Sequence, residues 1–88
     1  MANLIFEDDE FKILKGKDFI LVRKNKPHHF HSHFDKLDGA KNVLNLFYKK
    51  IKPQAAYFHE SMRRICTEDE FAMMRNEKIK QRYRNSRR

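Results

Sequence analysis

The chain has 88 residues and a formal net charge of +8, with 20 Lys and Arg against 12 Asp and Glu. This length suits one small domain, and the chain has no run of about 18 apolar residues that could cross a membrane. Its first residues lack the pattern of a signal peptide. The single cysteine, Cys66, excludes an intramolecular disulfide and follows an apolar stripe, so we expect a buried thiol in a cytoplasmic protein.

The first part of the chain predicts antiparallel strands. Residues 3–6 are apolar and predict a first strand or a packed arm, and residues 7–10 predict an acidic turn. Residues 11–14 and 18–23 are apolar runs joined by a short link around Gly16, which is typical of a β-hairpin. We therefore expect a hairpin near the start of the domain.

The segment after the basic turn at residues 23–26 alternates between histidines and other residues. In an extended strand, Phe30, Ser32 and Phe34 would point toward the core and the histidines would point away from it. This segment would form a third strand that pairs with the hairpin. Residues 3–34 thus predict a hairpin or a three-stranded meander with one face open to solvent.

The rest of the chain predicts helices. Apolar residues with a period of 3.6 mark a helix over residues 37–51, with Asp38 as its N-cap and Pro53 as its stop. The same pattern marks a second helix over residues 54–66. The sequence TEDE then matches a capping box and starts a third helix, which we expect over residues 67–83.

These elements predict an α+β fold, with a compact domain over residues 1–74 and a basic helical extension or tail over residues 75–88. Glu77 is the single acid of the extension. Lys and Arg side chains pair with phosphates, so the extension and two smaller basic groups predict a nucleic-acid contact. The predicted contact residues are Arg75, Lys78, Lys80, Arg82, Arg84, Arg87, Arg88, Arg63, Arg64, Arg23, Lys24 and Lys26.

A row of alternating histidines is the other candidate site. His29, His31 and His33 would project from one face of a strand, about 7 Å apart. An H-x-H pair on a strand can bind one metal ion such as zinc, and Asp35 could add a carboxylate ligand. The alternatives are a solvated sheet face rich in histidine and a nucleic-acid contact made by the same face.

Two further patterns give weaker indications. The Pro-linked junction between the first two helices would suit a helix-turn-helix, with Gln54, Tyr57 and Ser61 offered to base edges. The sequence has no Gly-rich phosphate loop and no paired-carboxylate motif, which favours a protein that is not an enzyme. A histidine-dependent nuclease is the one enzymatic alternative.

The sequence therefore predicts a small nucleic-acid-binding protein that uses its basic extension and basic loops. The alternative is a protein–protein interaction module, such as a regulator or inhibitor of a nucleic-acid-processing enzyme, whose basic surface meets an acidic partner. A histidine-dependent metal-binding protein is the third hypothesis. We expect no membrane partner, and a homodimer stays open because an exposed sheet edge could pair with a second copy.

Overall fold

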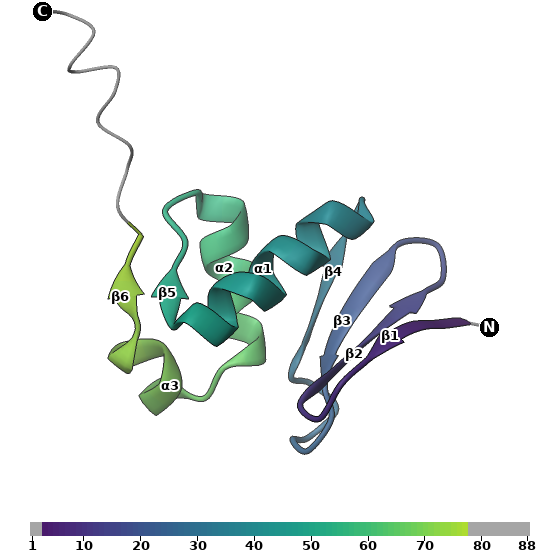
Figure 1. Cartoon of the computed structure of the whole chain (residues 1–88), viewed down its shortest axis with the longest axis horizontal. Helices are drawn as coiled ribbons and strands as arrows, with labels where there is room; N and C mark the ends of the chain where they lie inside the picture. The colour runs from purple at the N-terminus through teal and green to yellow at the C-terminus, as the bar shows by residue number, and fades with distance from the viewer. Residues whose placement is uncertain (1–2, 78–88) are drawn as a thin grey trace, which may run out of the picture.

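The protein is an α+β domain in which helices cover one face of an antiparallel sheet. A computed structural model describes residues 3–77 (Figure 1). The sheet is a meander in the order β1-β2-β3-β4. Its strands are β1 (Asn3–Glu7), β2 (Phe11–Lys15), β3 (Phe19–Arg23) and β4 (His31–Phe34). The predicted fold class is confirmed, and the sheet has one more strand than a three-stranded meander because the first apolar segment pairs with β2.

Local polar contacts shape the first turn of the meander. The side chain of Asp8 accepts hydrogen bonds from the backbone N–H groups of Glu10 and Phe11, at 2.9 and 2.8 Å. Its other carboxylate oxygen accepts a hydrogen bond from the hydroxyl of Tyr48 at 2.8 Å. The acidic segment thus forms the turn that its composition predicts, because an Asp side chain can satisfy turn amides.

The helices are α1 (Leu37–Lys49), α2 (Ala56–Ile65) and α3 (Glu68–Met73). The prediction of Asp38 as the N-cap of α1 is wrong, because Lys36 occupies that position without a side-chain cap and Asp38 lies in the first turn. The predicted capping box is confirmed: the backbone N–H of Glu70 donates to the side chain of Thr67, and the Glu70 side chain accepts from the backbone of Thr67.

The third helix is shorter than predicted. It ends at Met73, and β6 (Arg75–Asn76) then pairs in parallel with β5 (Ile51–Lys52). The prediction of a helix is therefore wrong over residues 74–77, where backbone pairing with β5 replaces helical hydrogen bonds. The remainder of that predicted helix lies outside the described residues.

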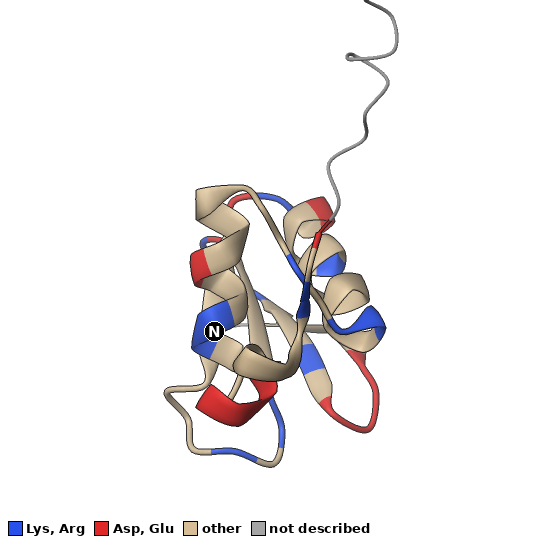
Figure 2. Ribbon diagram, turned by 90° about the vertical axis from the view of Figure 1, so that its left-hand side faces the viewer, with Lys and Arg blue, Asp and Glu red and all other residues tan. Residues whose placement is uncertain are grey.

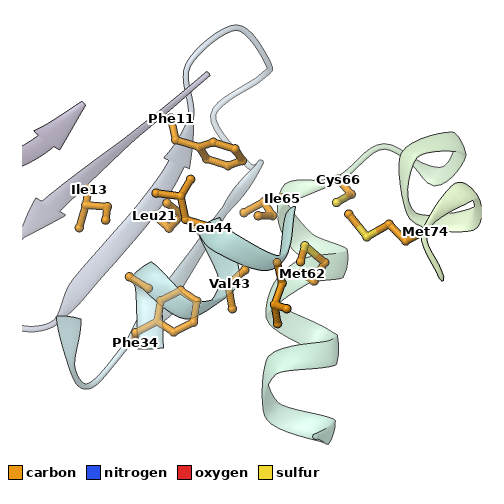
Figure 3. Packing of buried hydrophobic residues seen from close by; sticks show 12 residues of the cluster. Phe11, Ile13, Leu21, Phe34, Val43, Leu44, Met62, Ile65, Cys66 and Met74 are labelled. Atoms are coloured by element: carbon orange, nitrogen blue, oxygen red, sulfur yellow. The ribbon is translucent and has the colours of Figure 1, made fainter. Parts of the chain in front are cut away.

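One core joins the sheet to α1 and α2. Figure 3 shows Phe11, Ile13 and Leu21 of the sheet facing the side chains of the helices. Alternation along β4 buries Ser32 and Phe34 as predicted, and the Ser32 hydroxyl donates to the backbone carbonyl of Ser61 at 2.7 Å. Among the described residues, no helix combines the length and the apolar character that crossing a bilayer requires.

The predicted burial of Cys66 is also confirmed. Its side chain lies in the core at the end of α2, with 6% of its surface exposed. Burial raises the pKa of the Cys66 thiol to about 12. A thiol that stays protonated at neutral pH is a poor nucleophile, so Cys66 serves packing.

A buried arginine links the sheet to α3. Arg23 is 5% exposed and donates two hydrogen bonds to the Glu70 carboxylate, from Nη1 at 2.8 Å and from Nη2 at 3.1 Å. Nη1 also donates to the carbonyl of Ile65 at 2.8 Å. The guanidinium lies 5.3 Å from the ring centroid of Phe11 and 5.0 Å from that of Phe47. Arg23 is therefore the polar centre of the core.

This ion pair makes stability depend on pH. The hydrogen bond from Arg23 lowers the pKa of Glu70 from its ordinary value of 4.5 to about 2. Between those values the unfolded chain binds more protons than the folded chain, so the free energy of unfolding falls as pH falls through this window. We expect Glu70 to account for a loss of about 1–2 kcal/mol, because solvent screens part of the interaction.

Urea denaturation of the wild type and of Glu70→Gln at a series of pH values measures this contribution. The wild type should be more stable at pH 6, and the gap should narrow as pH falls from about 4.5 to about 2, where about half of the folded wild-type carboxyl groups are protonated. A gap that stays constant from pH 6 to pH 2 would show that the charge of Glu70 contributes nothing.

Candidate nucleic-acid interface

The basic extension starts on the body of the domain, beside the C-terminal end of α1. The backbone N–H of Arg75 donates to the carbonyl of Lys50 at 3.0 Å, and that of Glu77 donates to the carbonyl of Lys52 at 2.9 Å. These bonds hold the first residues of the extension against β5. Lys49, Lys50 and Arg75 are exposed, and Lys52 is half-buried. We call Lys49, Lys50, Lys52 and Arg75 the basic ribbon.

The end of α1 directs the chain into this ribbon. Lys50 adopts a left-handed conformation with φ of 59°, and its backbone N–H reaches the carbonyls of Leu46 and Phe47. A residue in this conformation ends a helix and reverses the chain. The ammonium group of Lys52 lies 4.6 Å from the ring centroid of Phe71, which places this lysine against α3.

Glu77, which follows β6, is held by hydrogen bonds with Gln54. Its side-chain Oε1 accepts a hydrogen bond from the backbone N–H of Gln54 at 3.0 Å. Its carbonyl accepts a second one from the side-chain Nε2 of Gln54 at 2.9 Å. The single acid of the extension is thus engaged by the segment that precedes α2. The sequence after it contains six cationic residues and no acid.

Those six residues were all predicted to contact nucleic acid, and they lie outside the described residues. They are Lys78, Lys80, Arg82, Arg84, Arg87 and Arg88. The structure therefore fixes where the cationic segment begins, through Arg75 and Glu77. In the sequence, Lys78 follows directly on Glu77, whose backbone N–H bonds to β5.

The predicted role of Arg23 in nucleic-acid contact is wrong. Its guanidinium is buried and binds Glu70, the Ile65 carbonyl and the carboxylate of Glu10, the last at 3.2 Å. A phosphate could reach it only by breaking these bonds. The period of two along β3 places Arg23 on the same face as the buried Leu21, and this signal was available in the sequence.

The other two cations of the 23–26 turn face acids of their own domain. Lys24 pairs with the carboxylate of Glu7 at 2.6 Å and donates to the carbonyl of Asp8 at 2.7 Å. Lys26 is half-buried, and its charge is one of the causes that lower the pKa of Glu70. The charges of these two lysines are thus compensated by acids of the same domain.

Arg63 and Arg64 lie exposed on α2. Each has an oxygen of Glu60 nearby, at 3.7 and 3.8 Å, with more than half of each arginine side chain exposed. Exposed pairs at such distances contribute little energy, so both guanidinium groups are free to bind an external anion. Figure 2 faces the helical end of the molecule and shows that Lys and Arg positions and Asp and Glu positions both lie on several of its segments.

The helix-turn-helix hypothesis fails on the geometry of the junction. Residues 50–55 separate α1 from α2 and contain β5, so the helices are not joined by a tight turn. Gln54 binds Glu77, and Ser61 is buried with its hydroxyl bonded to the carbonyl of Tyr57. Two of the three side chains assigned to base edges are therefore used inside the domain.

The histidine row is shorter than predicted. β4 begins at His31, and His29 lies in the preceding turn, where its ring packs 4.8 Å from that of Phe30. His31 and His33 stay together on the open face of the sheet. In residues 3–77 no group of three or more His, Cys, Asp or Glu side chains is placed to hold a metal ion. The predicted row of three histidine ligands is thus reduced to a pair.

Sequence reasoning also missed part of the candidate interface. The lysines at the end of α1 suit the dipole of that helix, and no signal in the sequence connects them to Arg75. No family model, no curated protein and no solved structure matches this chain.

Proposed function

We propose that the protein binds nucleic acid through the basic ribbon and the cationic segment that continues from it. The observation that carries this proposal is the parallel pairing of β6 with β5, which joins Arg75 to the lysines at the end of α1. The pairing brings Arg75 and the lysines at the end of α1, which lie far apart in the sequence, into one region of the surface. Lys and Arg side chains on such a surface bind phosphates and release counterions.

Three features favour a phosphate-binding role for the basic ribbon over a role as a solvated surface alone. The exposed cations of the ribbon have no salt-bridge partner among the described residues. Glu77, the acid that follows β6, is engaged by Gln54. Backbone pairing holds Arg75 in place, so binding costs less ordering entropy there than it would on a free tail.

The proposal is tested by neutralising the ribbon in the full-length chain. The test variant carries Lys49→Gln, Lys50→Asn and Arg75→Gln, where asparagine is chosen because it tolerates the left-handed conformation at that position. The control carries Lys17→Gln, Lys36→Gln and Lys41→Gln, which removes the same charge from exposed sites elsewhere. Fluorescence titrations against short single- and double-stranded DNA and RNA give the affinities at several salt concentrations.

The ribbon variant should bind more weakly, and the slope of log affinity against log salt should become shallower by about three units on duplex DNA. The control should keep most of the wild-type slope. Equal losses in the two variants would mean that net charge alone governs binding. If the wild type does not bind even at 50 mM salt, the proposal fails and an acidic protein surface becomes the partner to seek.

A further inference from the structure

A pair of histidines on the open face of β4 is arranged like the ligands of a metal ion. His31 and His33 alternate along the strand and project away from the core, opposite Val22 and Ile20 of β3. Their ring centroids lie 5.1 Å apart. Two imidazoles that bind one zinc ion at about 2.0 Å, with a tetrahedral angle between them, have ring centroids roughly 5 Å apart.

Each of the two rings is also oriented by a hydrogen-bonding partner at its Nδ1 atom. Nδ1 of His31 lies 2.7 Å from the carbonyl oxygen of His28, and Nδ1 of His33 lies 3.1 Å from a carboxylate oxygen of Asp18. Because these oxygens can only accept, each Nδ1 carries the proton and donates it. In the tautomer that this arrangement favours, Nε2 is the nitrogen with a free lone pair. Histidines that bind metals are held in this way by a carbonyl or a carboxylate.

The backbone beneath the pair is fixed as well. The carbonyl of His33 accepts a hydrogen bond from the hydroxyl of Tyr57 at 3.2 Å. Both flanking residues of the strand, Ser32 and Phe34, are anchored in the core. The two imidazoles therefore stand on a rigid strand, so that little ordering is needed when an ion binds.

We propose that His31 and His33 form a surface chelate for a divalent transition-metal ion, bound through the two Nε2 atoms, with Asp18 and the His28 carbonyl as the outer shell. Imidazole ligands select zinc, nickel or copper over calcium and magnesium, which prefer oxygen ligands. Two protein ligands leave coordination positions for water or for a donor group of another molecule. His29 belongs to the turn and is not part of this chelate.

Calorimetric titration of the full-length chain with Zn²⁺, Ni²⁺, Cu²⁺ and Mg²⁺ tests the proposal. Copper should bind most tightly of the three transition metals, and magnesium should not bind measurably at the same concentrations. The double variant His31→Gln/His33→Gln should lose at least 10-fold in affinity. The control His29→Gln/His59→Gln removes two imidazoles that lie outside the chelate and should bind as the wild type does. Equal losses in both double variants, or a loss in neither, would overturn the chelate.

The outer shell gives an independent test. Asp18→Asn keeps the size of the side chain but removes the carboxylate that orients His33, and should weaken metal binding by about 10- to 100-fold. Asp35→Asn removes an exposed carboxylate next to β4 and should change the affinity little. The melting temperature without metal should be the same for both variants. If Asp18→Asn binds zinc as the wild type does, the proposed arrangement is wrong.

Discussion

Replacing Arg23 with methionine is expected to lower the free energy of unfolding by about 3 kcal/mol. The substitution removes the cation that pairs with Glu70 and Glu10 and the donor to the buried carbonyl of Ile65. It also removes the guanidinium that lies against the rings of Phe11 and Phe47. We expect the low end of the range for a broken buried pair, since both carboxylates reach water. For a domain of this size the loss is a large share of the total stability.

Urea denaturation measures this loss, and Lys24→Gln is the matched control. Lys24 is the next cation along the chain and also pairs with an acid, but it lies on the surface. Its substitution should cost less than about 1 kcal/mol. A cycle with Glu70→Gln should show a coupling between Arg23 and Glu70 of about 1–3 kcal/mol. The structural role of Arg23 is refuted if its substitution costs no more than that of Lys24.

Neutralising the cationic residues after Glu77 should have the largest effect on binding. With Lys78, Lys80, Arg82, Arg84, Arg87 and Arg88 all replaced by glutamine, six phosphate contacts become unavailable. Counterion release assigns a slope of roughly −5 on duplex DNA to six such contacts. Between 50 and 200 mM salt, this slope corresponds to a change in affinity of about a thousand-fold. The variant should therefore bind weakly and respond little to salt.

The matched control replaces only the four arginines of this segment, by lysine. It keeps every charge and loses the bidentate geometry of the guanidinium groups. Its salt slope should equal that of the wild type, while the glutamine variant loses about five units. If the glutamine variant keeps the wild-type slope, the phosphate contacts lie elsewhere on the molecule.

The sequence predicted the fold class, the buried face of β4 and the start of α3, because these depend on short-range patterns, whereas the N-cap of α1 was predicted wrongly. Alternation around Ser32 and Phe34 identified the buried face of β4, and the spacing of Thr67 and Glu70 identified the start of α3. The residues at which individual helices end were harder to predict. α3 stops early because Arg75 and Asn76 pair with β5, and strands of two residues have no periodicity to detect.

The candidate site could be predicted only in part. The cationic composition of the extension was visible, but its neighbours were not, because the pairing of Arg75 with Ile51 joins segments 24 residues apart. Arg23 was assigned to the nucleic-acid contact because it belongs to the basic turn at residues 23–26. Its partner Glu70 is 47 residues away in the sequence, so no local sequence pattern predicts the ion pair.

The most direct test of the account is to map nucleic-acid binding onto individual residues. Two-dimensional ¹H–¹⁵N NMR spectra of the labelled full-length chain would be recorded during titration with a short oligonucleotide. We predict that, among the described residues, the amides of residues 49–52 and 75–77 shift first and furthest, since they carry the basic ribbon. The largest shifts on β1 or β4, with the ribbon unchanged, would contradict the proposed interface.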